Sequence, residues 1–464
     1  MHRVASQRGT ECSISATGKG LSHELTNVHY SESRGAQQSI LNMTAKKLLF
    51  LARSFPPICH IASLRASNVA KYLTKREWRT TVVTVNPASL NPSIVDPIGF
   101  PVPEDPRIRV CYTKGGSGLM LGGKLRSRMT KMVPFLFDFL RAKGKRFGIA
   151  NDVGWKRQIG RVCSSFKPED FNVILATGEP FSSFEMARRL SVEKGRPYVL
   201  DYRDLWTMGP FLEKPLPNRI RNREETLVRD ATAVVVVSAA MAAALDDQLH
   251  CGDKTYVITN GFDPDEVDRV CPLRFGGPAI VYCGTLIPPN IMLGPVMAAL
   301  ALVRKSGSHY CKQVRFHFYG RQGDLCMESA RRFGVEDLVI LHGFVSRSEI
   351  LAATKAATAA VVVTSVNSAS SIWDNGVVTG KLFEPLGIKT PICLISPRGS
   401  DARKIVEEAD AGSCFTGDQV EQIAEYIISL CEGRQTPTFK NCSIYSWPEL
   451  AKRLDEVLTK SLGA

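Results

Sequence analysis

The sequence lacks any apolar run long enough to cross a membrane. Its longest, ATAVVVVSAAMAAAL, extends from Ala231 to Leu245 and falls short of the roughly 20 residues that a spanning helix needs. We predict a buried strand over 233–238 there, followed by a helix. The first 43 residues also lack the apolar block of a secretory signal. They are rich in Ser, Gly, His and Gln without periodicity, so we predict a disordered extension over 1–43.

Cysteine spacing excludes a further set of functions. The thirteen cysteines are scattered singly, and no C-x-x-C pair occurs. The spacing that is typical of zinc sites and dithiol redox sites is therefore absent. An odd, unpatterned count in a long chain is typical of free thiols in a reducing compartment. We expect a cytoplasmic protein.

Acidic residues are fewer than basic residues. The chain has 59 Lys and Arg against 45 Asp and Glu, a net charge of +14, which favours an anionic partner. The stretch 118–168 alone holds 12 basic and 2 acidic residues, 12 − 2 = +10, with apolar and aromatic residues between them. This pattern predicts a peripheral protein on the anionic cytoplasmic face of a membrane; the alternative is a solvated helical face over an ordinary core. No zinc spacing or recognition helix supports nucleic-acid binding, so we expect no nucleic acid as partner.

What the sequence does have is a repeated alternation of short apolar runs and helical segments. The runs are continuously apolar, as in parallel strands buried on both faces. This order predicts an α/β fold of two doubly wound, Rossmann-like domains. Gly, Pro and Asp crowd residues 259–278 and mark the boundary. We predict domains over 44–265 and 266–440 and a final helix within 441–464, opened by an S-x-x-E capping box at Ser446 and Glu449.

Candidate binding residues follow the strands of the predicted second domain. In a doubly wound sheet, ligands bind at the carboxyl ends of the strands, where helix N-termini favour anions. Gly284 and Thr285 follow the first strand, and Arg321 follows the second. Gly284 allows the backbone to approach a phosphate, which Arg321 and Lys381 can bind. Glu384, one turn after Lys381, can accept both hydroxyls of a ribose; the alternative is an i, i+3 ion pair between these two residues.

A second group of candidates follows the strands of the predicted first domain. Asp201, Arg203 and Asp204 lie in DYRDLWT, and His60 lies in the loop after the first strand. Asp204 or Asp201 can orient an acceptor hydroxyl, and Arg203 can bind an anionic group. We predict Asp204 and Arg203 as catalytic residues, with His60 and Asp201 on the acceptor side. The alternative is a buried Asp–Arg pair that fixes the loop.

Nine segments carry a family resemblance, and they cover nearly everything from Lys47 to the C-terminus. In order, they are LARSFPP (51–57), ATGEPFSSF (176–184), DYRDLWT (201–207), VVVVSAAM (234–241), ITNGFDPDE (258–266), YCGTL (282–286), LHGFVSRSEI (341–350), GKLFEPLG (380–387) and GSDARKIVEEADAG (399–412). In these segments the chain resembles the GT-B glycosyltransferases of family 4, which use nucleotide sugars.

The resemblance implies an acceptor-binding N-terminal domain and a donor-binding C-terminal domain that face a cleft, with a last helix that crosses back. It implies transfer of a sugar, usually with retention, from a nucleotide-diphosphate sugar to a lipid-linked or polysaccharide acceptor. Glu384 would hold the donor ribose. No metal or other cofactor is expected, because positive side chains and helix ends offset the diphosphate charge. The D-x-D string at Asp263–Asp265 is not taken as a metal site, because Pro264 marks a turn.

The sequence departs from the family pattern at several places. A glutamate is common eight residues before the ribose-binding one, where this chain has Gly376 with Asp374 and Asn375 nearby. An Arg and a Lys common after the first strand of the second domain are missing, and Arg321 and Lys381 are the candidate substitutes. The first loop reads ICHIAS in place of a glycine pair. The alternative function is therefore a non-catalytic GT-B-like module that binds a membrane or a partner transferase.

Overall fold

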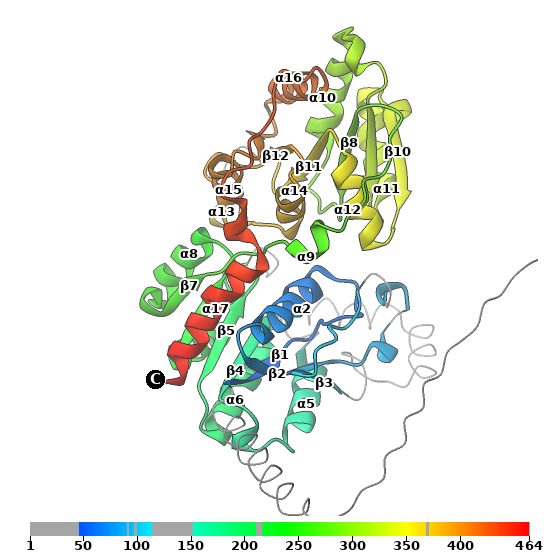
Figure 1. The fold of residues 1–464 in the computed structure, drawn as a ribbon. Helices are drawn as coiled ribbons and strands as arrows, with labels where there is room; N and C mark the ends of the chain where they lie inside the picture. The colour runs from blue at the N-terminus through cyan, green and yellow to red at the C-terminus, as the bar shows by residue number, and fades with distance from the viewer. Residues whose placement is uncertain are drawn as a thin grey trace, which may run out of the picture. The chain divides into compact units, whose positions relative to one another are not determined.

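Two parallel β-sheets organise the chain (Figure 1). The computed structural model describes residues 46–90, 92–96, 100–113, 152–209, 216–367 and 371–463; the extension predicted over 1–43 lies outside them. The first sheet has the strand order β3-β2-β1-β4-β5-β6-β7, and the second has the order β10-β9-β8-β11-β12-β13. Each order runs outward on both sides of the sheet's first strand, which is the doubly wound arrangement. The predicted fold of two Rossmann-like domains is confirmed.

The N-terminal lobe comprises the elements from β1 to β7. Its strands are β1 (Lys46–Leu51), β2 (Trp78–Val85), β3 (Ile108–Thr113), β4 (Val173–Gly178), β5 (Tyr198–Tyr202), β6 (Ala233–Val236) and β7 (Thr255–Val257). Its helices are α2 (Ile61–Thr74), α5 (Asp152–Cys163), α6 (Ser182–Lys194), α7 (Asn218–Asp230) and α8 (Ala239–Leu249). Successive strand residues point to opposite faces, so Leu49 of β1 packs with α5, α6, α7 and α8, while Phe50 packs with α2.

The C-terminal lobe comprises the elements from β8 to α16. Its strands are β8 (Ala279–Cys283), β9 (Arg315–Tyr319), β10 (Val339–Gly343), β11 (Ala359–Val363), β12 (Ile392–Ile395) and β13 (Gly412–Phe415). Its helices are α10 (Gly294–Lys305), α11 (Gly323–Phe333), α12 (Arg347–Ala356), α13 (Ile372–Gly376), α14 (Phe383–Ile388), α15 (Asp401–Glu408) and α16 (Val420–Cys431). One face of the sheet packs with α10, α11 and α16, and the other packs with α12, α14 and α15.

The last helix, α17 (Trp447–Leu462), returns to the N-terminal lobe, as the resemblance implies. Trp447, Leu450 and Leu454 join the core formed by β1 and α2. Asp455 accepts hydrogen bonds from Trp78 Nε1 at 2.8 Å and from Lys46 Nζ at 2.9 Å. Burial alone would raise the pKa of Asp455, but these bonds and one from an arginine hold it at about 2.

The capping box predicted for this helix is wrong. The helix begins directly after Ser446, but the hydroxyl of Ser446 donates to the carbonyl of Ser443 at 2.6 Å. It therefore caps no amide of the first turn. The segment just before Ser446 forms a 3-10 helix over Cys442–Tyr445, and the Ser446 hydroxyl makes its hydrogen bond to this helix.

The connection between the two lobes is the segment from the end of β7 to the start of β8, and it binds α2 through hydrogen bonds and ion pairs. Asp263 caps the short helix α9 (Pro264–Val267) and accepts from the Tyr72 hydroxyl at 2.6 Å and from Lys71 Nζ at 2.7 Å. Asp265 pairs with Lys71 at 3.0 Å and with Lys75 at 3.2 Å. The D-x-D string therefore forms a capped turn, whose carboxylates bind the cations of α2.

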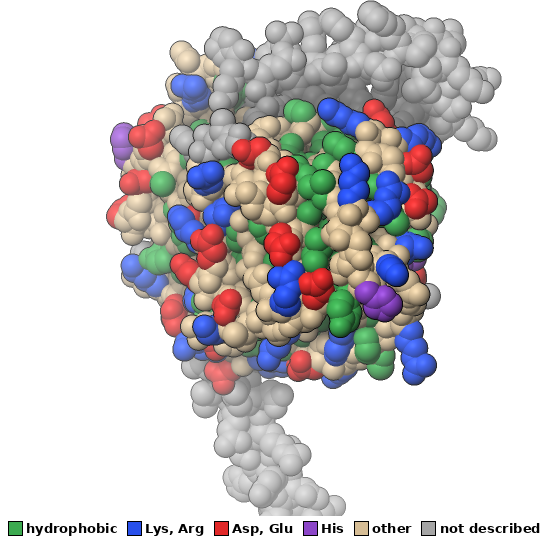
Figure 2. Space-filling view, turned by 90° about the horizontal axis from the view of Figure 1, so that it is seen from above, with side chains coloured by type: hydrophobic (Ala, Val, Ile, Leu, Met, Phe, Trp, Pro, Cys, Tyr) green, Lys and Arg blue, Asp and Glu red, His purple; other side chains and the backbone are tan. Residues whose placement is uncertain are grey.

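None of the described helices is both long and apolar enough to cross a membrane. On the face seen in Figure 2, basic and acidic side chains are interspersed. Residues 118–151 of the basic stretch lie outside the described residues. In its described part, Lys156 pairs with Glu185 and Lys167 lies 4.0 Å from Glu169. The twelve described cysteines are free thiols.

Candidate functional site

The strand order changes direction between β1 and β4 in the first sheet and between β8 and β11 in the second. Strand ends at such a switch point diverge and leave a crevice in which ligands bind. Gly284 and Thr285 directly follow β8, and His60 ends the loop that follows β1. Predicted residues of both lobes thus lie at the strand ends where a ligand is expected.

Two predicted residues of the C-terminal lobe, Gly284 and Thr285, lie beside a third, Lys381. This lysine lies in the 3-10 helix Gly380–Leu382. Its Nζ donates to the carbonyl of Thr285 at 3.0 Å and to the hydroxyl of Tyr282 at 3.2 Å, and lies 5.1 Å from the centre of the Tyr282 ring. Burial lowers the pKa of Lys381 to about 8. The ammonium group is therefore a poorly solvated cation beside the loop after β8, which suits it to an anionic ligand.

Gly284 makes this arrangement possible. Its φ of +132° is a backbone conformation that side-chain-bearing residues rarely adopt, and a Cβ there would lie 2.1 Å from Cε of Lys381. The backbone at Gly284 can therefore run directly beneath the lysine. The sequence predicts that Gly284 lets the backbone approach a ligand closely. The structure adds that the same glycine leaves room for the side chain of Lys381.

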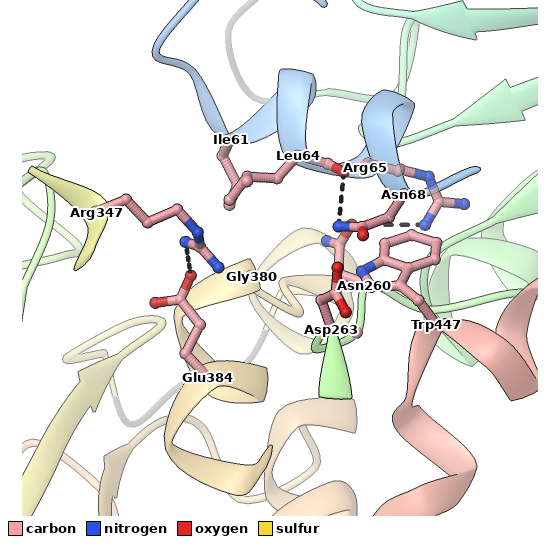
Figure 3. A pocket seen from close by; sticks show the side chains of 11 residues that line it. Ile61, Leu64, Arg65, Asn68, Asn260, Asp263, Arg347, Gly380, Glu384 and Trp447 are labelled. Atoms are coloured by element: carbon pink, nitrogen blue, oxygen red, sulfur yellow. Dashed lines mark hydrogen bonds and ion pairs between the residues drawn. The ribbon is translucent and has the colours of Figure 1, made fainter. Parts of the chain in front are cut away.

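Glu384 does not pair with Lys381, so the alternative of an i, i+3 ion pair is wrong. Its Oε1 accepts from Nη1 of Arg347, the first residue of α12, and the two side chains point toward each other in Figure 3. Arg347 also bonds both oxygens of Glu266 in α9, at 2.6 and 2.8 Å. Sequence reasoning missed Arg347, although it lies in LHGFVSRSEI; the N-cap Ser346 before it was the available signal.

Arg321 lies at the exposed end of β9, as predicted. Its guanidinium group lies 3.8 Å from the centre of the Phe344 ring. Burial and Asp96 raise the pKa of the Cys59 thiol, and the positive charges of Arg321 and Arg347 oppose this rise. Both guanidinium groups therefore act on the loop that precedes α2, in the other lobe.

In the N-terminal lobe, Arg203 holds the loop after β4. Its Nε donates to the carbonyl of Gly178 at 2.5 Å, and its Nη2 donates to that of Glu179 at 2.7 Å. Desolvation by the surrounding protein raises the pKa of Asp204, and the charge of Arg203 opposes this rise. The Asp204 side chain is nevertheless exposed.

His60 is the N-cap of α2. Its Nδ1 accepts from the amide of Ala62 at 3.2 Å, and burial, with the charges of Arg203 and Arg53, lowers its pKa. A neutral imidazole that accepts through Nδ1 carries its proton on Nε2. His60 thus presents a hydrogen-bond donor, and its electrostatic coupling to Arg203 puts the two predicted residues in one neighbourhood.

The structure corrects the expectation for Asp201. Only 3% of this residue is exposed, and its carboxylate accepts from Nε and Nη2 of Arg65 at 3.1 and 2.7 Å. Arg65 also donates to the backbone carbonyls of Ile258 and Thr259, at 3.1 and 2.8 Å. Asp201 is therefore part of a buried Asp–Arg pair, the alternative considered for this motif, although the partner is Arg65 and not Arg203.

A pocket lies between α2, the connection and α14 (Figure 3). Ile61 and Leu64 of α2 line one wall, and Arg347 and Glu384 line another. Glu384 thus lines a space between the two lobes. At Gly376, a Cβ would lie 3.3 Å from Met241 and 3.4 Å from Ser238 of the other lobe. A side chain at position 376 would therefore meet residues of the N-terminal lobe.

Comparison with known proteins agrees with this geometry. Residues 62–261 match the family model of a glycosyl transferase 4-like domain. The fold is similar to that of sucrose-phosphate synthase from Thermosynechococcus elongatus (TM-score 0.60, 12% identity, covering 90% of this chain and 99% of that one). It is also similar to that of HepE from Anabaena in complex with UDP and glucose (TM-score 0.52, 15% identity, covering 89% of this chain and 100% of that one). A third similar structure is that of the lipopolysaccharide outer core galactosyltransferase WaaB (TM-score 0.53, 11% identity, covering 89% of this chain and 99% of that one).

These similarities define the class of fold. The chain has the GT-B fold, two Rossmann-like lobes with a last helix that returns to the first lobe. The model that matches its N-terminal lobe is that of a family 4-like glycosyltransferase, and the fold and this match together support a glycosyltransferase. No curated protein matches the sequence.

Proposed function

We propose that this protein transfers a sugar from a nucleotide-diphosphate sugar to a lipid-linked or saccharide acceptor. One observation carries the proposal: Lys381, a desolvated cation, is held against Gly284 and Thr285 at the switch point of the second sheet. Burying a cation without a full counter-charge costs free energy. A diphosphate at this position would supply the missing charge, and HepE, a structure with the same fold, binds UDP.

Donor binding uses residues of the C-terminal lobe. The diphosphate would lie along the loop of Gly284 and Thr285, where Lys381 and Arg321 offset its charge. The ribose hydroxyls would donate to the carboxylate of Glu384. Because the two cations stabilise the charge that develops on the leaving diphosphate, no metal ion is needed in this scheme.

Acceptor activation uses residues of the N-terminal lobe. The acceptor oxygen forms the new bond to the anomeric carbon of the sugar while the bond from that carbon to the diphosphate oxygen breaks. Asp204, whose pKa is raised by desolvation, is suited to orient the acceptor hydroxyl and take its proton. His60 would donate from Nε2 to the sugar, and Arg203 would keep the loop at Gly178 in place. The proposed outcome is retention of configuration, which requires the acceptor oxygen to approach the anomeric carbon from the same face that the diphosphate leaves.

We further propose that the enzyme works at the cytoplasmic face of a membrane. The support is the composition of the stretch 118–168, whose twelve basic residues are mixed with apolar and aromatic ones. Such a segment binds anionic lipid by charge and by partial insertion. A vesicle-binding assay with and without anionic lipid tests this part of the proposal separately from catalysis.

The test of the proposed function is turnover. The purified chain is incubated with a panel of UDP-, GDP- and dTDP-sugars, and release of nucleoside diphosphate is measured. We expect release with one nucleotide class, stimulated by a saccharide or lipid-linked acceptor. Absence of release from every donor, by a folded protein, would contradict the enzymatic proposal.

One observation favours a second function, a non-catalytic GT-B-like binding module. Gly376 stands where family members commonly have a glutamate, and it packs closely against Met241 and Ser238. This alternative predicts nucleotide binding without turnover of any sugar donor. Binding measured beside the release assay therefore distinguishes the two functions.

Donor affinity should depend on pH through Lys381. Its folded-state pKa of about 8 lies below the ordinary value of 10.5. A bound diphosphate favours the charged form, so above pH 8 binding must take up a proton. We expect the affinity for a nucleotide sugar to be constant below about pH 7.5 and to fall by up to about tenfold per pH unit above pH 8. Calorimetric titration at several pH values measures this.

The variant Lys381→Arg is the control for this pH dependence. Arginine stays charged throughout this range, so its affinity should not fall between pH 8 and 10. An equal fall in both proteins would show that another group titrates.

Replacing Gly284 by alanine should damage both folding and binding. The strained φ costs on the order of 1–3 kcal/mol, and the new Cβ would displace Lys381. We expect a lower free energy of unfolding in urea and loss of nucleotide affinity by at least about tenfold, because a hydrogen bond to a charged group is worth about 1.5–3 kcal/mol. At Gly276 a Cβ meets nothing within 4 Å, so Gly276→Ala should change neither quantity. Wild-type affinity in Gly284→Ala would disprove the role of this glycine.

A further inference from the structure

Arg347 is a buried cation to which the proposed donor site gives no role. Its Nε and Nη2 donate to the two oxygens of Glu266 at 2.6 and 2.8 Å, and its Nη1 donates to Oε1 of Glu384. Only 10% of its side chain is exposed. Burial alone would lower the pKa of Arg347, but the two carboxylates raise it well above its ordinary value. The guanidinium group therefore stays charged and bridges two elements that are far apart in the sequence.

This bridge fixes one oxygen of Glu384 and leaves the other without a hydrogen bond from the described residues. Within the described part of the chain, Oε1 accepts from Arg347, and no residue donates to Oε2. A carboxylate oxygen can accept two hydrogen bonds, which matches the two neighbouring hydroxyls of a ribose. In Figure 3 the Glu384 carboxylate lies beside the guanidinium group of Arg347, and both residues line the pocket.

The bridge also separates two negative charges. Glu266 and Glu384 bind the same guanidinium group from α9 and α14. Without that group the two carboxylates would repel each other, and Glu384 would lose the partner that selects its orientation. Because α9 belongs to the connection between the lobes, the bridge ties the orientation of Glu384 to the connection.

We infer that Arg347 is a positioning residue, which holds the Glu384 carboxylate ready for the donor's ribose and links it to the interdomain connection through Glu266. This inference rests on the proposed donor role of Glu384. It assigns to Arg347 an effect on recognition of the ribose hydroxyls, and none on the diphosphate.

The experiment compares ribonucleotides with analogues that lack both hydroxyls. Affinities for UDP and GDP and for their 2′,3′-dideoxy analogues are measured on the full chain and on Arg347→Met. The wild type should prefer the ribonucleotide by roughly tenfold or more, because a hydrogen bond to a charged group is worth about 1.5–3 kcal/mol. In Arg347→Met this preference should largely disappear, while affinity for the dideoxy analogue changes little. Arg347→Lys should recover part of the preference.

Two further variants make the result decisive. Glu266→Gln leaves both Arg347 and Glu384 in place but weakens the bridge, so it should lower the preference by an intermediate amount, and it answers the question if Arg347→Met does not fold. Arg304→Met removes an exposed Arg–Asp pair of the same lobe and should keep the wild-type preference.

Three outcomes count against the inference. An unchanged preference in Arg347→Met and Glu266→Gln overturns it, while the proposed function stands. An equal loss of affinity for ribonucleotide and dideoxy analogue shows a merely structural role. A wild type that binds neither UDP nor GDP overturns the inference, and the proposed function falls with it if dTDP does not bind either.

Discussion

Replacement of Lys381 by methionine should weaken nucleotide-sugar binding and turnover without destabilising the protein. The lost contact is a charge-assisted hydrogen bond in a poorly solvated site, worth about 1.5–3 kcal/mol, so we expect an affinity roughly 10- to 150-fold lower. The folded-state pKa of Lys381, about 8, shows that the fold disfavours its charge. Removing that buried charge should raise the thermal unfolding temperature. Calorimetry with the ligand and scanning calorimetry without it measure the two effects.

The opposite directions of these two effects separate a binding role from a structural one. Lys440 also lies in the C-terminal half of the chain, but 66% of its side chain is exposed. The control Lys440→Met should therefore change affinity and stability little. If Lys381→Met bound the donor as well as the wild type, the diphosphate would not lie at the loop after β8.

Replacement of Asp201 by alanine should produce a large loss of stability. It would leave the guanidinium group of Arg65, whose side chain is 4% exposed, without its bidentate carboxylate. Removing one partner of a buried ion pair costs about 3–5 kcal/mol. For a lobe of this size we expect the unfolding temperature to fall by on the order of 10 °C. Thermal unfolding monitored by circular dichroism measures this.

An exposed pair provides the matched comparison. Asp230 binds Arg188 at 2.7 Å, and both side chains are substantially exposed, so Asp230→Ala should cost less than about 1 kcal/mol. If Asp201→Ala left stability unchanged but abolished turnover, Asp201 would be an acceptor-side residue after all, and the buried pair would not be its main role.

The central strands could be predicted from the sequence because burial on both faces makes them continuously apolar. VILATG forms β4 and YVLDY forms β5, and all residues of both strands are buried. Two of the edge strands, β3 and β13, give a weaker signal, because IRVCYT and GSCF are only partly buried and mix apolar with polar residues. Edge strands have one neighbour only, so the signal on which the prediction depends is weak there.

The candidate site was predictable in part for a similar physical reason. Strand ends are visible in a sequence, and the positions of Gly284, Thr285 and Lys381 beyond such ends made them candidates. The partners of the charged residues were not predictable, because they depend on tertiary folding. Arg65 and Asp201 lie 136 positions apart, and Arg347 and Glu384 lie 37 positions apart. Neither spacing corresponds to a local turn or helix.

The central claim is that the C-terminal lobe binds a nucleoside diphosphate, with the Glu384 carboxylate on the ribose. The most direct measurement is thermal unfolding of the wild type and of Glu384→Ala with UDP, GDP or dTDP. At least one nucleotide should raise the unfolding temperature of the wild type, and this increase should be lost in Glu384→Ala. No increase with any of the three, or an equal increase in both proteins, would contradict this claim.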